Sequence, residues 1–105
     1  MKKIALLVFA VLVFSSLALA GAKTITGTVS DSHCGVKHST PSDAAAHCVE
    51  HCVSGGGKYV LVSKGKVYQL DAQDKFKGLG GKSVTVTGTV KGTNITVASV
   101  AEKST

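Results

Sequence analysis

The sequence predicts a small all-β protein, a five-stranded OB-like barrel with a Cys/His-bearing helical insertion between its first two strands. Three observations predict this fold. Five apolar or alternating segments are separated by turn residues. One or two predicted helical turns, ended by glycine, lie between the third and fourth segments, where an OB barrel has its helix. The first and fourth segments share the pattern Thr-[Ile/Val]-Thr-Gly-Thr-Val, as expected of neighbouring strands that coil at a glycine.

Residues 1–20 have the features of a secretory signal peptide. A basic start is followed by an apolar run over 4–14 and by the small-x-small pattern at 18–20. The run is too short to cross a bilayer core of about 30 Å, so we expect no membrane span in the mature form. Cleavage would leave 21–105 as a single OB-like domain, exported to the periplasm or secreted, in an oxidising compartment.

The strands of this domain follow from alternation and turn signals. They are predicted over residues 24–29, 59–62, 67–70, 84–90 and 95–100. Gly65 supplies the positive φ that a tight hairpin between the second and third strands needs. Residues 71–81 are expected to form a short helix of one or two turns, ended by glycine. The alternative architecture is a meander sandwich, in which the mid-strand glycines are only weak points.

The insertion, residues 31–57, carries the residues with the most distinctive chemistry. All four histidines and all three cysteines of the chain lie in it. They are His33, Cys34, His38, His47, Cys48, His51 and Cys52. Thiol and imidazole groups at this density indicate a disulfide, a metal site or thiol chemistry.

The second half of the insertion is predicted to be a helix, with Thr40 as its cap and three glycines after its end. Its apolar stripe consists of Ala45, Ala46, Val49 and Val53 and is expected to face the barrel. Cys48 and Cys52 lie at the edge of this stripe. The two histidines of the helix, His47 and His51, lie further outward.

The same spacing limits the disulfides. Cys48 and Cys52 are four residues apart on a helix, where Cβ atoms are about 5–6 Å apart, whereas a disulfide needs about 3.5–4.5 Å. Cys34 could instead pair with either of them. A Cys34–Cys48 bridge would stabilise the domain by about 3 kcal/mol in the loop-entropy model. One cysteine is then left over and could link two chains as a dimer.

A metal site would use all three cysteines. The thiolates of Cys34, Cys48 and Cys52 could converge on one ion, with His38, His51 or His33 as the fourth ligand. A Cys3His set suits Zn²⁺, and a thiolate-rich set also suits Cu(I). His47 completes the candidate ligands.

These observations predict an exported, non-catalytic binding module whose Cys/His cluster binds Zn²⁺ or Cu(I). One alternative is a disulfide-stapled structural or interaction domain without a metal. A second is a thiol redox protein that uses Cys48 or Cys52. The sequence indicates no other cofactor and leaves the partner open as a small ligand, a metal or a protein. Its net charge is +6, but all 12 basic residues are lysine, which together with few aromatic residues argues against nucleic-acid binding.

Taken together, these motifs resemble those of a family of small exported bacterial proteins of unknown function. The shared patterns are Gly-x-Val-x-Asp-x-x-Cys-Gly at 27–35, Cys-x-x-x-Cys at 48–52, a hairpin at 59–70 and Gly-x-x-Val-x-Val-x-Gly at 81–88. The resemblance implies an OB-like barrel and an exported location. It implies no activity.

Overall fold

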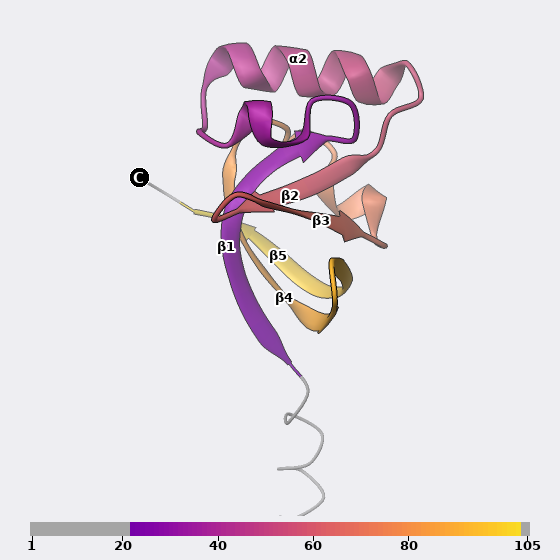
Figure 1. Ribbon diagram of the computed structural model, residues 1–105. Helices are drawn as coiled ribbons and strands as arrows, with labels where there is room; N and C mark the ends of the chain where they lie inside the picture. Colours follow the sequence, from indigo (N-terminus) through magenta and orange to yellow (C-terminus); the bar gives the residue numbers. More distant parts are fainter. Residues whose placement is uncertain (1–21, 104–105) are drawn as a thin grey trace, which may run out of the picture.

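Five strands close into a barrel in the order β1-β2-β3-β5-β4 in the computed structural model, which describes residues 22–103 (Figure 1). The predicted signal peptide lies outside the described residues. The strands are β1 (Lys23–Asp31), β2 (Tyr59–Ser63), β3 (Lys66–Leu70), β4 (Ser83–Lys91) and β5 (Asn94–Glu102). The helices are η1 (Gly35–His38), α2 (Asp43–Ser54) and η2 (Gln73–Phe76). The predicted OB-like barrel, with its helical insertion between the first two strands, is therefore confirmed.

Strand β1 is long and is shared by both halves of the barrel. Its first part pairs antiparallel with β4, and its last part pairs antiparallel with β2. The change of partner occurs next to Gly27, where a side chain would overlap the carbonyl oxygen of Val62. The repeated sequence pattern meets itself here, because Thr24 pairs with Thr87. The prediction that the first and fourth strands are neighbours is thus confirmed. Glycine is needed at position 27 because β2 approaches the backbone there.

The predicted hairpin between β2 and β3 turns at Lys64 and Gly65, which have φ values of 51° and 77°. Two positive φ values in a two-residue loop define the type I′ turn that matches strand twist. The barrel closes through a short parallel contact between β3 and β5, over Leu70↔Ile95 and the preceding pair. Between β3 and β4, η2 places Phe76 in the core with no exposed surface.

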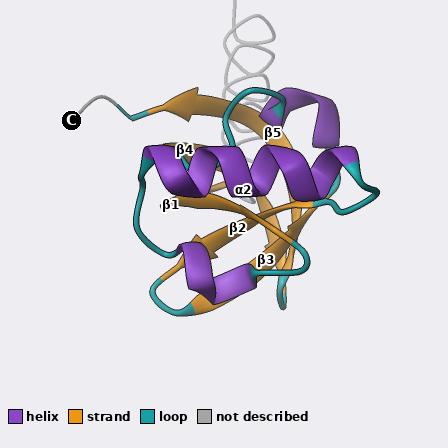
Figure 2. Cartoon of the chain, turned by 90° about the horizontal axis from the view of Figure 1, so that it is seen from above, coloured by secondary structure: helices purple, strands orange, loops and turns teal. Residues whose placement is uncertain are grey.

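Helix α2 lies across one end of the barrel (Figures 1 and 2). The predicted apolar stripe faces inward, with Val49 fully buried, Ala45 buried and Val53 packed against the core. The barrel side of this core is formed by Val29, Tyr59, Leu61, Leu70, Phe76, Val84, Val86 and Ile95. The helix therefore completes the core of a domain whose barrel is too small to bury it alone.

The start of α2 differs from the prediction. Thr40 does not cap the helix; the cap is Ser42, whose Oγ accepts a hydrogen bond of 3.0 Å from the backbone N–H of Ala45. The backbone N–H of Ser42 donates to the carbonyl oxygen of Gly81 at 3.2 Å, so the barrel loop sets the point where the chain enters the helix. Within residues 22–103, no helix is long and apolar enough to cross a membrane.

Candidate metal centre

Four side chains of the insertion converge beneath α2. Asp31, Cys34, His38 and Cys48 each offer one potential metal ligand, and these four atoms all lie within 4.8 Å of one another. They come from three elements: Asp31 ends β1, Cys34 and His38 lie at the two ends of η1, and Cys48 lies in α2. This Asp/Cys/His/Cys group, called the metal cluster below, could hold a metal ion.

The two side-chain oxygens of Asp31 have different environments. The side chain is fully buried, and Oδ1 accepts hydrogen bonds of 2.9 Å from the backbone N–H groups of His33 and Cys34. These bonds fold the turn that leads into η1. Oδ2 is buried without a hydrogen-bond partner. Leaving a carboxylate oxygen in this state is costly, because burial removes its hydration without replacing it.

His38, another member of the metal cluster, also has a buried atom without a partner. Its Nε2 is buried and has no hydrogen-bond partner. Among the described residues, Nε2 of His38 and Oδ2 of Asp31 are the buried side-chain nitrogen and oxygen atoms in this state, and both belong to the metal cluster. Buried polar atoms in folded proteins are nearly always satisfied. A cation coordinated by these two atoms would satisfy both.

The two thiols of the metal cluster are free and close together. Sγ of Cys34 lies 4.0 Å from Sγ of Cys48. Two thiolates bound to one tetrahedral zinc ion at about 2.3 Å would be roughly 3.8 Å apart, whereas bonded sulfurs are about 2.0 Å apart. The structure thus contains no disulfide among its three described cysteines, and the Cys34–Cys48 spacing fits two ligands of one ion.

The electrostatics of the metal cluster oppose an uncompensated thiolate. Burial raises the pKa of the Cys34 thiol to about 11, reinforced by its hydrogen bond with Cys48 and by the negative charge of Asp31. A bound cation would favour the thiolate over the protonated thiol, because the cation pairs with the negative charges. The ion would therefore displace protons from the thiols as it binds.

Two hydroxyl groups of β1 fix η1 in place. Oγ of Ser30 donates to the carbonyl oxygen of Gly35 at 2.8 Å, and Oγ1 of Thr28 donates to that of Ser39 at 3.1 Å. Both side chains are buried, so the bonds are protected from competing water. Because they lie at the two ends of η1, they hold the backbone that carries the cysteine and histidine ligands.

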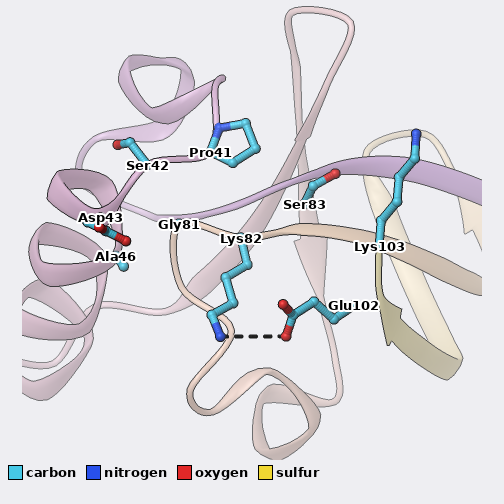
Figure 3. A pocket seen from close by; sticks show the side chains of 9 residues that line it. All are labelled: Pro41, Ser42, Asp43, Ala46, Gly81, Lys82, Ser83, Glu102 and Lys103. Atoms are coloured by element: carbon cyan, nitrogen blue, oxygen red, sulfur yellow. Dashed lines mark hydrogen bonds and ion pairs between the residues drawn. The ribbon is translucent and has the colours of Figure 1, made fainter. Parts of the chain in front are cut away.

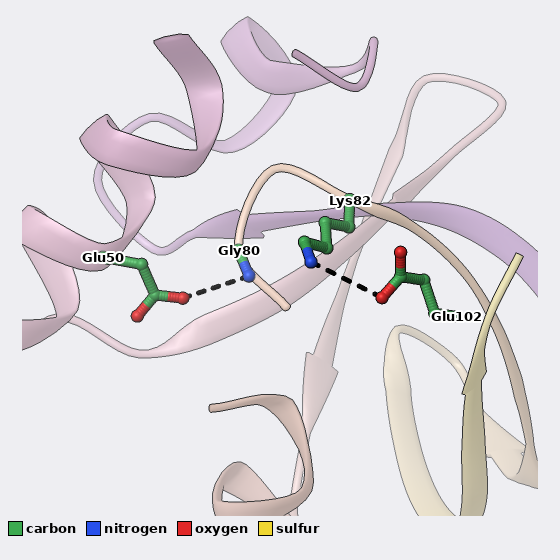
Figure 4. Close-up of polar contacts among 4 residues, drawn as sticks. All are labelled: Glu50, Gly80, Lys82 and Glu102. Carbon is green, nitrogen blue, oxygen red and sulfur yellow. Dashed lines mark hydrogen bonds and ion pairs between the residues drawn. The ribbon is translucent and has the colours of Figure 1, made fainter. Parts of the chain in front are cut away.

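Glu50 fixes α2 on the other side. Its Oε2 accepts a 2.6 Å hydrogen bond from Oη of Tyr59, and its Oε1 accepts a 3.1 Å bond from the backbone N–H of Gly80 (Figure 4). Burial, followed by this contact with Glu50, raises the pKa of Tyr59 to about 12. A side chain at the neighbouring Gly81 would overlap the backbone of Ala46. This close docking sets where Cys48 meets the other ligands.

The remaining predicted ligands lie around the metal cluster. Cys52 is half-buried and lies outside the metal cluster. Burial is the largest cause that raises the pKa of the Cys52 thiol, and the negative charges of Asp31 and Cys48 raise it further. His47 and His51 are exposed on the outer face of α2. His33 is also exposed.

Three of the seven residues singled out from the sequence therefore meet in the metal cluster, and the fourth member was missed. An aspartate at the end of a strand indicates a local turn, and the two hydrogen bonds that Oδ1 of Asp31 accepts form that turn. The available signal was its place three residues before Cys34, at the end of a strand that leads into the insertion.

A separate surface hollow of about 590 Å³ lies where the start of α2 meets β4 and β5 (Figure 3). Its lining residues are Pro41, Ser42, Asp43, Ala46, Gly81, Lys82, Ser83, Glu102 and Lys103. The charges there are balanced, and Nζ of Lys82 lies 3.5 Å from Oε1 of Glu102. None of the metal-cluster residues lines it.

Comparison with known proteins adds a partial family match. Residues 53–102 match a family described as "Protein of unknown function (DUF5818)". The matched region runs from the end of α2 to the end of β5, so it contains four of the five strands and none of the metal-cluster residues. No curated protein and no solved structure matches the chain significantly. In its last four strands, the chain is similar to a family for which no function is described.

Proposed function

We propose that the chain is an exported, non-catalytic module that binds one Zn²⁺ ion through Asp31, Cys34, His38 and Cys48. The observation that carries this proposal is the pair of buried, unpartnered atoms, Oδ2 of Asp31 and Nε2 of His38, beside two free thiols. A disulfide between the thiols would leave both polar atoms unsatisfied. A cation would satisfy them and bind the thiolates as well.

The donor set favours zinc over Cu(I). Cu(I) prefers soft thiolate and thioether ligands, whereas zinc accepts sulfur, imidazole nitrogen and carboxylate oxygen together. The metal cluster offers two sulfurs, one nitrogen and one oxygen. Four protein ligands fill a tetrahedral zinc ion and leave no position for a substrate, which supports a binding or structural role over catalysis.

The ion would join the two parts of the insertion to the barrel. Asp31 belongs to β1, Cys34 precedes η1, His38 ends η1, and Cys48 belongs to α2, so a bound ion would cross-link three elements. Because the ligands must lose protons and converge, part of the binding free energy becomes folding free energy. For a domain of this size, such a cross-link replaces the disulfide that many small exported domains use.

Export is supported by the predicted signal peptide over residues 1–20. The resemblance to small exported bacterial proteins points in the same direction. In an oxidising compartment, free thiols tend to form disulfides. Coordination would keep Cys34 and Cys48 reduced there, which fits the proposed zinc site.

Intact mass tests the proposal. The full chain is expressed with its leader, purified from the export compartment, and measured under native and denaturing conditions with and without added zinc. We expect export with loss of the leader, one zinc ion that is lost on denaturation, and three thiols that can then be alkylated. A mature chain that has lost two hydrogens and retains one alkylatable thiol would support the disulfide-stapled alternative and refute the zinc site.

A matched pair of histidine variants locates the ion. His38→Ala removes a metal-cluster ligand, whereas His51→Ala removes an exposed imidazole from the outer face of α2. We expect the first variant to lose bound zinc and the second to keep it. If both variants kept zinc equally, the assigned ligand set would be wrong.

A further inference from the structure

We propose that His47 and His51 form a second metal site, separate from the metal cluster, that binds one Ni²⁺ or Cu²⁺ ion on the outer face of α2. Both histidines were candidate ligands for the ion of the cysteines, but the structure puts them outside the metal cluster, with exposed side chains. This second site goes beyond the proposed function and is independent of it, because it uses none of the four metal-cluster residues.

The spacing of the two histidines fits one ion. They lie four residues apart in α2, so they share a face of the helix and their Cβ atoms are about 5–6 Å apart. At bond lengths of about 2.1 Å, two nitrogens at right angles on one ion are roughly 3 Å apart. Rotation about the side-chain torsions of the two histidines covers this difference. Histidine pairs at this spacing are metal ligands in helical zinc sites.

Both imidazoles are available to an ion. Helix α2 is the outermost element at its end of the barrel (Figures 1 and 2), and the ion pairs within residues 22–103 involve neither histidine. A hollow of about 320 Å³ beside His47 is lined also by Asp43, Ala46 and Glu50. The hollow leaves room for water ligands, and the exposed carboxylate of Asp43 adds a negative charge that favours a cation there.

The backbone between the two histidines is fixed by the barrel. They flank Val49, which is fully buried, and Glu50, whose carboxylate accepts hydrogen bonds from Tyr59 and Gly80. The separation of the two Cβ atoms is therefore set before an ion arrives. Binding then has to order only the two side chains, which limits its entropic cost.

Glu50 also separates metal binding from hydrolysis. The order His-x-x-Glu-His over residues 47–51 occurs in a class of zinc peptidases, and in such helical sites a glutamate serves as general base. Here Oε2 of Glu50 accepts a 2.6 Å hydrogen bond from Tyr59, and Oε1 accepts a 3.1 Å bond from Gly80. Both oxygens are thus used to dock the helix, so the pair is assigned to metal binding and not to catalysis.

The donors favour a late divalent transition metal. Imidazole suits nickel, copper and zinc, and the affinity of a given ligand set rises from Co²⁺ through Ni²⁺ to Cu²⁺. Two imidazoles can occupy two neighbouring positions of the tetragonal arrangement that Ni²⁺ and Cu²⁺ prefer, and water fills the others. The four ligands of the metal cluster instead suit a tetrahedral zinc ion.

The test uses Ni²⁺ as the probe. The full mature chain is first loaded with zinc and then dialysed against a series of Ni²⁺ concentrations, and both metals in the protein are counted by mass spectrometry. We expect one nickel ion per chain with no loss of zinc. His47→Ala, His51→Ala and the double variant should each bind nickel at least about tenfold more weakly, and to the same degree, because a single imidazole cannot chelate.

The control is His33→Ala, which removes another exposed imidazole and should bind nickel as the wild type does. Wild-type nickel affinity in either single variant, losses that add up in the double variant, or nickel that only replaces zinc would overturn the proposal. Failure of the zinc site would look different, because zinc would then be absent before dialysis while the effect of the His47 and His51 substitutions on nickel binding would persist.

Discussion

Asp31→Asn separates the two roles of the Asp31 side chain. The amide oxygen of the variant can still accept the two 2.9 Å hydrogen bonds that fold the turn before η1. The second oxygen, which is buried without a partner, is replaced by an uncharged amide nitrogen. The substitution therefore keeps the turn and removes one ligand of the metal cluster.

The expected effect on stability depends on the metal. In the metal-free protein, the variant no longer buries a carboxylate oxygen without a partner. Its free energy of unfolding should therefore be at least that of the wild type, and higher by at most about 1 kcal/mol. With free zinc at about 1,000 times the wild-type Kd, the wild type gains about 4.1 kcal/mol. If loss of the carboxylate weakens binding about 100-fold, the variant gains only about 1.4 kcal/mol. Zinc should thus stabilise the wild type by roughly 2.7 kcal/mol more than the variant.

Urea unfolding followed by far-ultraviolet circular dichroism measures both differences, under a phosphine reductant and with either a chelator or excess zinc. Asp74→Asn is the control, because the Asp74 side chain is 93% exposed and its contact is a surface ion pair. This control should show the wild-type response to zinc. If Asp31→Asn gained as much stability from zinc as the wild type does, Asp31 would not be a ligand.

Two further predictions concern the docking of α2. Gly81→Ala should lower the free energy of unfolding by at least about 3 kcal/mol, because Gly81 has a φ of 73° and its added Cβ would overlap the backbone of Ala46. The control is Gly92→Ala, whose φ is 59° and whose added Cβ would meet open space; it should lower the free energy of unfolding by only about 1–2 kcal/mol in the same urea assay. Equal losses in the two variants would contradict the docking of α2 against Gly81. The raised pKa of Tyr59 predicts a stabilising contribution of the neutral phenol that is complete below its usual pKa of about 10 and is lost as the pH rises towards about 12. Unfolding measured across this range should show the stability advantage of wild type over Tyr59→Phe decrease with pH, and a constant difference would refute the assignment.

The barrel could be predicted from the sequence because its information is local and repeated. Alternation in β4 places Val84 and Val86 in the core, and the pattern shared with β1 predicts that these strands pair. Each of these features needs only a period of two residues and a glycine at a close approach. The helix wheel also placed His47 and His51 on the outside, where the structure shows them.

What could not be predicted depends on contacts between distant segments. Ser42 rather than Thr40 caps α2, where a hydrogen bond from the backbone of Ser42 joins the helix start to Gly81. The burial of Asp31 Oδ2 likewise depends on tertiary structure, because the other side chains of its cluster come from η1 and α2. From the sequence, an aspartate before a turn indicates only the local hydrogen bonds that Oδ1 makes. The ligand set therefore required the tertiary structure, although its sulfur and imidazole donors were visible in the sequence.

The supports of the metal cluster indicate which part of the insertion depends on the ion. Helix α2 is held independently, through the two hydrogen bonds of Glu50 and the burial of Val49. Segment η1 has no buried residue of its own and is tied to β1 by two hydroxyl bonds. Because an ion would bind both ends of η1, through Cys34 and His38, it would stabilise this segment more than the helix. Coordination would thus act on a segment that has no buried residue of its own, while the barrel and α2 would hold the remaining ligands in place.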